Sequence, residues 1–354
     1  MLRSYVALHV LSSQKGVVSD IGLSETEHWR LSPGWGLNYM KAKFTGHDTF
    51  SLRYGWPLKT VNYIKNNGLL SSADNVRAAE AVSALGVGKN MINAMRYWSE
   101  AAMLTTSSTG GAELAQSATE LGAFLLDEED GHDPYLENVG SIWLLHFLLN
   151  FNDEELTAYR YFFNYSNVLV FEKTKLLADL ASDVVRLTRT NKINQNTVKK
   201  DLDCFLNTYT LRGRGESGRK VQRVNEDNFQ SPLSELNLIS DLGRGLFRAE
   251  TAERPTLPLA IFLYALVRFQ GDLHSDVREA RLSVEDLLTR PKSPGKIFRL
   301  SEAALGQLLD RAVTQFPTAI QWIDSLGLKQ VVLSGEISDD PMALLVKFYE
   351  GELQ

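Results

Sequence analysis

The stretch from Asp74 to Leu104 constrains the fold of this chain more than any other. Apolar residues recur at helical spacing up to Leu85, so the sequence predicts a helix that Asp74 caps and Gly86 ends. After a short turn a second apolar face predicts another helix, and its members are Met91, Ile92, Met95, Trp98 and Ala102. Two helices joined by a short glycine turn form the helix-turn-helix pattern.

Four side chains of the second predicted helix lie off its apolar face: Lys89, Asn90, Asn93 and Arg96. Asparagine and arginine make bidentate contacts with the edges of adenine and guanine, and a lysine can contact a phosphate. We therefore expect this helix to lie in the major groove of DNA. The alternative is a pair of core helices that bind nothing, because the same pattern also occurs without DNA binding.

Two basic segments stand out in a chain whose formal net charge is −6. Residues 41–65 contain five Lys or Arg, including Arg53, and one acid; residues 186–223 contain ten Lys or Arg and three acids. Such asymmetry favours a nucleic-acid face on an otherwise acidic protein, although solvated helix surfaces produce milder versions of it.

The second basic segment contains another predicted helix pair. Residues 172–187 form one amphipathic pattern, and Asn194 begins the next, which turns Lys199 and Lys200 outward. A glycine- and arginine-rich loop follows, where we expect phosphate contacts from Arg212, Arg214, Arg219 and Lys220. The competing interpretation is a solvated basic hairpin.

Two stretches could carry chemistry. His47 and Asp48 precede the first predicted helix, where they could act as an acid/base pair or form a buried polar turn. Residues 113–137 contain eight acids and no Lys or Arg. The hypothesis is metal-dependent cleavage of DNA with Mg²⁺ or Mn²⁺, and its candidate groups are His47, Asp48, Asp127, Glu128, Asp130, His132 and Asp133. The acidic loop could instead dock a basic partner.

The remaining patterns predict a mainly α-helical protein. Its N-terminal domain, residues 40–150, would be a winged helix with residues 105–111 as a wing tip or a linker. Residues 151–354 would form a second helical domain that could also be winged-helix-like, with short strands at 247–249 and 297–300. Residues 1–39 show no sustained period and read as an extension. The single cysteine, Cys204, excludes an internal disulfide, and no signal or membrane-length segment appears, so a cytoplasmic protein is expected.

Several long runs of this chain resemble a bacterial family first defined as a domain of unknown function. The matching runs include residues 44–56, 85–98, 133–144, 198–209, 231–233 and 294–300. Members of that family include the SspB component of single-stranded DNA phosphorothioation systems. The resemblance implies a DNA-binding nickase that works with a cysteine desulfurase, an ATPase and an ATP-pyrophosphatase-like sulfurtransferase. The family pattern is expected to have Glu at the position of Asp48, and no nuclease signature of the family maps onto the chain.

The sequence therefore predicts a DNA-binding protein of a phosphorothioate modification and antiphage defence system, which nicks DNA or presents it for sulfur insertion. A non-catalytic DNA-binding scaffold or transcription-type regulator remains an alternative. A subunit that binds only other proteins is a third possibility.

Overall fold

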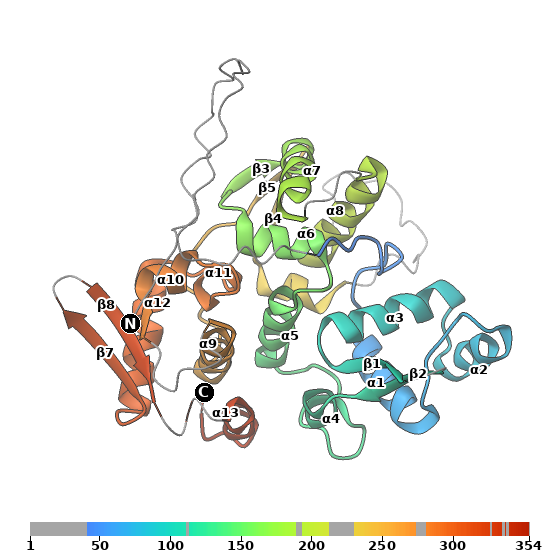
Figure 1. The fold of residues 1–354 in the computed structure, drawn as a ribbon, viewed down its shortest axis with the longest axis horizontal. Helices are drawn as coiled ribbons and strands as arrows, with labels where there is room; N and C mark the ends of the chain where they lie inside the picture. Colours follow the sequence, from blue (N-terminus) through green and yellow to red (C-terminus); the bar gives the residue numbers. More distant parts are fainter. Residues whose placement is uncertain are drawn as a thin grey trace, which may run out of the picture. The chain divides into compact units, whose positions relative to one another are not determined.

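The computed structural model describes residues 41–110, 113–188, 193–211, 230–273, 281–325, 328–334, 337 and 340–353. Within these ranges the chain is mainly helical, as predicted, with three small antiparallel sheets (Figure 1). The extension expected at residues 1–39 lies outside the described residues. None of the described helices is both long and apolar enough to cross a bilayer.

The first module, residues 55–118, has the predicted order of helices. It contains α1 (Gly55–Asn67), α2 (Asn75–Leu85), α3 (Lys89–Ala101) and the paired strands β1 (Thr105–Gly110) and β2 (Glu113–Ala118). The predicted caps are confirmed: the Asp74 carboxylate accepts a hydrogen bond from the Val76 amide at 3.0 Å, and Gly86 ends α2 with φ at 68°. Residues 105–110 form the first strand of a hairpin with residues 113–118.

The face of α2 that is buried is not the face that carries its larger apolar residues. Ala78, Ala81 and Leu85 are buried, whereas Val76 is 64% exposed and Val82 is 36% exposed. The periodicity thus identified this helix correctly but not the face that it buries.

A fully buried helix follows the first module. The short α4 (Glu120–Leu126) leads through the acidic loop to α5 (Val139–Phe151), in which every residue from Gly140 onward is buried. A Cβ atom at Gly140 would come within 2.4 Å of the Phe348 ring, so only glycine allows this close approach. In Figure 1, α5 lies between the first module and α9 (Leu259–Leu273), and α9 and the 3₁₀ turn Pro232–Leu236 pack against it.

The second module spans residues 157–248. It contains α6 (Thr157–Arg160), a π-helical turn (Tyr161–Tyr165), β3 (Val170–Glu172), α7 (Lys173–Thr188), α8 (Gln195–Tyr209), a 3₁₀ turn (Pro232–Leu236), β4 (Ser240–Gly243) and β5 (Leu246–Arg248). Lys199 and Lys200 face outward on α8, as predicted, and its buried side carries Val198, Leu202, Phe205 and Leu206. The strand expected near Phe247 is present as β5.

The third module spans residues 259–333. Its elements are α9 (Leu259–Leu273), β6 (Arg281–Ser283), α10 (Val284–Thr289), α11 (Pro294–Ile297), α12 (Glu302–Gln315), β7 (Ile320–Ser325) and β8 (Leu328–Leu333). One more helix, α13 (Pro341–Tyr349), follows this module. The predicted strand at 297–300 is wrong. Ser293 caps a helical turn there, Pro294 is favourable in its first turn, and Arg299 adopts φ at 51° just after it.

The second and third modules share one topology. Each begins with a helix and a strand, continues with further helices and ends in a hairpin. In both sheets the first strand pairs with the last strand, so the strand orders are β3-β5-β4 and β6-β8-β7. The first module has three helices followed by a hairpin. One hydrophobic core runs through all three modules, and α5 itself crosses the domain boundary proposed at residue 150, which stays a prediction.

Candidate nucleic-acid interface

The N-terminal end of α3 is suited to an anion. Lys89 and Asn90 are exposed, Gly88 precedes them, and no side chain caps the helix. The first turn carries no acid. Unpaired amide groups and the positive end of the helix dipole attract phosphates, and Lys89 adds a full charge at this end.

Arg96 and Asn93, which are also proposed to read bases, differ in their contacts within the protein. Arg96 is partly exposed and makes no hydrogen bond or ion pair with another described residue. The Asn93 side-chain oxygen instead accepts a hydrogen bond from the Ser72 hydroxyl, in the turn before α2. Arg96 is therefore more available to a base edge, whereas Asn93 also orients the two helices.

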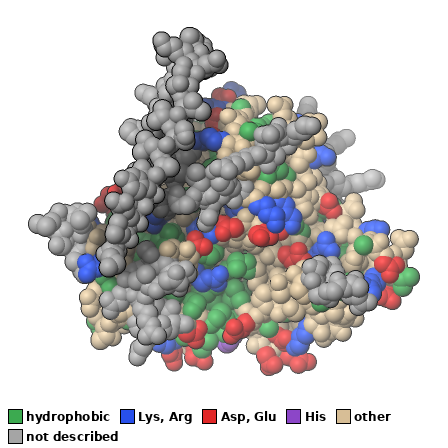
Figure 2. All heavy atoms as spheres, viewed as in Figure 1, with side chains coloured by type: hydrophobic (Ala, Val, Ile, Leu, Met, Phe, Trp, Pro, Cys, Tyr) green, Lys and Arg blue, Asp and Glu red, His purple; other side chains and the backbone are tan. Residues whose placement is uncertain are grey.

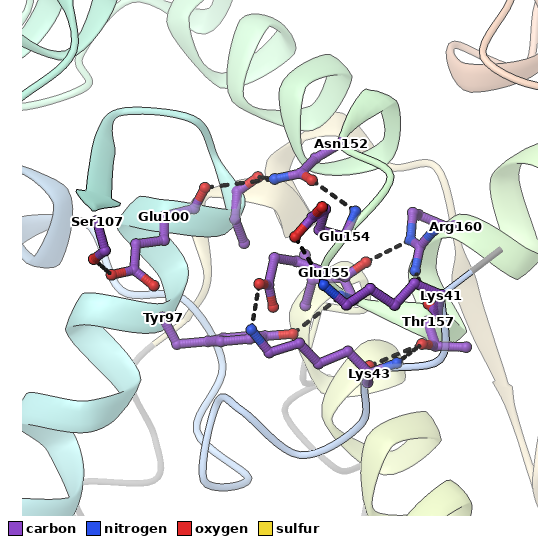
Figure 3. Close-up of polar contacts among 12 residues, drawn as sticks. Lys41, Lys43, Tyr97, Glu100, Ser107, Asn152, Glu154, Glu155, Thr157 and Arg160 are labelled. Atoms are coloured by element: carbon purple, nitrogen blue, oxygen red, sulfur yellow. Dashed lines mark hydrogen bonds and ion pairs between the residues drawn. The ribbon is translucent and has the colours of Figure 1, made fainter. Parts of the chain in front are cut away.

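The inner side of α3 is held rigidly. Ile92, Met95 and Trp98 are completely buried, and the Trp98 indole donates to the Phe50 carbonyl at 2.9 Å. At the C-terminal end, the Asn152 side chain donates to the Ala101 carbonyl at 3.0 Å (Figure 3). Such fixed positioning suits a helix that must present side chains to a groove.

The first basic segment is largely occupied by contacts within the protein. Figure 3 shows Lys41 paired with Glu154 and Lys43 paired with Glu155. Lys65 pairs with Asp127, Lys59 donates to the Leu85 carbonyl, and Arg53 lies 5.0 Å from the centre of the Trp56 ring. The positive charge of residues 41–65 is therefore mostly neutralised or packed locally.

The described surface shows the same mixing of charges on a larger scale. On the face seen in Figure 2, basic and acidic side chains alternate, and no broad field of one sign is visible among the coloured atoms. Any contact with a nucleic acid on this face would therefore depend on individual, well-placed cations and helix ends.

The second module presents a comparable helix. Asn194 caps α8 through the Asn196 amide, and Lys199 and Lys200 are exposed in its first turns without a described partner. The loop residues expected to contact phosphates lie outside the described residues; they are Arg212, Arg214, Arg219 and Lys220.

His47 is buried against the second module. Its side chain is completely buried, and Nε2 lies 2.7 Å from Oδ1 of Asp201 on α8. Burial lowers the pKa of His47, but the Cys204 and Asp201 side chains raise it to about 10 overall. The Thr49 amide, which donates to Nδ1 at 3.1 Å, favours the neutral ring instead. In both states Nε2 holds the proton that Asp201 accepts, so this pair joins the segment before α1 to the second module.

Asp48 lies in a strained turn beside His47. Its φ is 46°, and Thr45 and Thr49 on either side are also left-handed. Gly46 is required there, because a Cβ atom would lie 2.2 Å from the Tyr97 ring. The Asp48 carboxylate is partly exposed and has no described partner.

Asp133 is committed to the backbone of the acidic loop. Its two oxygens accept hydrogen bonds from the Glu137 amide at 2.8 Å, the Asn138 amide at 3.0 Å and the Ser141 hydroxyl at 2.5 Å. Asp127 likewise accepts from the Glu129 and Asp130 amides at 3.0 and 3.3 Å. These two carboxylates therefore shape the loop that leads into α5.

The candidate catalytic residues make separate sets of contacts. Among the described residues no hydrogen bond joins Asp133 to His47 or Asp48. Asp133 bonds to the turn before α5 and to Ser141, whereas His47 bonds to Asp201 on α8. Among the described residues no group of three or more His, Cys, Asp or Glu is arranged to hold a metal ion. The residues proposed for Mg²⁺ or Mn²⁺ thus do not fit a preformed metal site.

Asp201 was not identified from the sequence as the residue that positions His47, although the sequence contains a signal for a buried carboxylate there. It falls on the inward face of α8 between Val198 and Phe205, and a carboxylate on such a face needs a buried partner. Besides His47 it also accepts a hydrogen bond from the Ala158 amide at 3.0 Å.

Comparison with known families gives one match, over residues 44–349, to a model described as "Protein of unknown function (DUF4007)". The chain belongs to this family. No curated protein sequence matches.

Two solved structures of SspB are similar to this member of the DUF4007 family. One is described as an SspB crystal structure, with 27% sequence identity and a TM-score of 0.75. The other is a magnesium ion-bound SspB crystal structure, with 26% identity and the same TM-score. Both comparisons cover 89% of this chain and 90% of the solved chain. The likeness therefore extends over all three modules.

Proposed function

We propose that this protein is a DNA-binding component of a bacterial phosphorothioation system, in which it acts as SspB does. The observation that carries this proposal is the likeness to SspB over nearly the whole chain, together with the uncapped, basic end of α3 in a helix-turn-helix arrangement. The sulfur-mobilising and ATPase proteins implied by the resemblance would be its partners.

We further propose that the modules are winged helices. In a winged helix the second helix of the helix-turn-helix reads the groove and the hairpin after it contacts the flanking backbone. The helices α3 and α8 occupy that place in the first and second modules, and both expose lysines near their N-terminal ends. The matching helix α12 exposes Glu302, Asp310 and Arg311, which makes it a poorer match for DNA.

Two activities remain to be separated, namely nicking and presentation of DNA to partner proteins. The bonding of His47 and Asp133 favours presentation, because neither side chain is available to a scissile phosphate. One related structure contains magnesium, so a nicking assay on supercoiled plasmid should include Mg²⁺ and Mn²⁺.

The test uses the wild type with Asp48→Asn and Asp133→Asn. Metal-dependent nicking that persists in a folded Asp48→Asn variant would exclude Asp48, and loss of nicking would support it. Because Asp133 caps the loop, Asp133→Asn is expected to lower stability and must be judged against its own unfolding curve. Salt-dependent DNA binding without nicking would support presentation. Absence of both would overturn the proposed function.

A further inference from the structure

The hairpin of the second module carries an arginine at its tip. Because β4 ends at Gly243 and β5 begins at Leu246, Arg244 and Gly245 alone form the turn. The Arg244 side chain is exposed and makes no hydrogen bond or ion pair with another described residue.

The turn itself does not account for this arginine. Arg244 has φ at 54° and Gly245 has φ at 78°, so both central residues are left-handed, as in the type I′ turns of tight hairpins. Asparagine, aspartate and glycine adopt this conformation at low cost, whereas a long side chain rarely does. A residue that is unfavourable for its own backbone suggests a role for the side chain.

The tip is also fixed at the start of α7, which is in turn tied to α8. The Gly245 carbonyl accepts a hydrogen bond from the amide of Lys173, the first residue of α7, at 2.9 Å. The Lys173 ammonium in turn lies 2.6 Å from a carboxylate oxygen of Asp203 on α8. Figure 1 shows β4 and β5 next to α7 in this module.

Exposed lysines on α7 and α8 belong to the same module as the tip. Lys175 on α7 and Lys199 and Lys200 on α8 are exposed. Two of the nearby acids are already engaged, since Asp203 pairs with Lys173 and Asp241 accepts the Gly243 amide at 2.8 Å. Glu172, opposite Leu246 in β3, is also exposed and places a negative charge beside the turn, so Arg244 is the unpartnered cation among the described residues of the tip.

We propose that Arg244 enters the minor groove of duplex DNA while α8 lies in the adjacent major groove. This inference rests on the DNA binding proposed above. A guanidinium is more weakly hydrated than an ammonium, and the narrow minor groove of A·T tracts concentrates negative potential. Glycines on both sides of Arg244 add no side-chain bulk, so the turn can come close to the sugar-phosphate backbone.

The test compares Arg244→Asn with Arg281→Asn, which removes an equal charge from the exposed start of β6. Asparagine suits the turn, so the first variant should fold and melt at or above the wild-type temperature. Affinity for an A·T-rich duplex is measured by fluorescence anisotropy at several salt concentrations. Arg244→Asn should weaken binding roughly tenfold, as expected for one specific contact, while Arg281→Asn leaves it unchanged. The salt slope should fall by about 0.9 in Arg244→Asn.

A minor-groove ligand supplies the second readout. Netropsin bound to the duplex should reduce wild-type affinity and have little further effect on Arg244→Asn. Arg244→Lys should recover the salt slope but not the full preference for A·T-rich sequence. Equal affinity, slope and netropsin sensitivity in wild type and Arg244→Asn would overturn the inference while leaving DNA binding intact. A wild type that binds no duplex would overturn the proposed function, and this inference with it.

Discussion

At the centre of α5, the His146 imidazole has a hydrogen bond at each nitrogen. The Tyr209 hydroxyl lies 2.8 Å from Nδ1, and Nε2 lies 2.8 Å from the Ile297 carbonyl, to which it donates. Complete burial lowers the pKa of His146 to about 3, although the carbonyl partner opposes this shift. His146 is thus a neutral core residue that links three distant parts of the chain.

His146 should make the fold sensitive to mild acid. Between its ordinary pKa of about 6.5 and the lowered value, the unfolded chain binds a proton that the folded chain does not. The contribution of His146 to stability is therefore constant above pH 6.5 and falls by about 1.4 kcal/mol per pH unit between pH 6.5 and about 3. Urea unfolding at pH 7 and pH 5 should show a loss about 2 kcal/mol smaller in His146→Gln than in wild type. Identical losses would contradict this role.

At the scale of elements, apolar periodicity and caps located the long helices well. The ends of α2 at Asp74 and Gly86, and the start of α8 at Asn194, follow from local side-chain chemistry. The sequence could not predict β6, because three residues show no alternation and the strand depends on pairing with β8. It also misplaced a strand at 297–300, where the capped turn at Ser293 decides the local structure.

The assignment of α3 as a recognition helix predicts different effects for two of its residues. Arg96→Ala should cost about 1–3 kcal/mol on the preferred sequence and flatten sequence preference, because a base contact is lost. Lys89→Ala should weaken binding to all sequences alike and reduce the salt slope by about 1.

Binding titrations against several duplexes at two salt concentrations distinguish these outcomes. Arg281→Ala, far along the chain on β6, serves as the control for loss of one charge. An Arg96→Ala variant that folds and keeps both affinity and preference would show that α3 does not read bases.

At the scale of the molecule, charge counting along the sequence was a poor guide to the surface. Lys43 and Lys65 belong to a basic segment, yet their partners Glu155 and Asp127 lie far away in sequence and become neighbours only in the fold. The catalytic hypothesis was limited in the same way. Sequence could place acids near histidines, but it could not reveal that Asp133 serves backbone amides or that His47 faces Asp201.

The modules are expected to depend on one another for folding. A fragment of residues 41–151 would expose α5, which Tyr209, Ile297 and Phe348 cover in the whole chain. It should aggregate or bind the dye ANS strongly, whereas a fragment of residues 41–138, which stops before α5, should do so much less. Sedimentation and dye fluorescence of both fragments check this. A soluble, dye-free fragment 41–151 would show that the first module folds alone.

The burial of α5 also has a consequence for biosynthesis. A ribosome extends a chain at about 5–20 residues per second, so the residues of α5 emerge on the order of ten seconds or more before Phe348, which packs against its first turn. During that interval the nascent chain carries an uncovered apolar segment. We therefore expect newly made chains to engage a chaperone that binds such segments, and to be released once α13 has emerged.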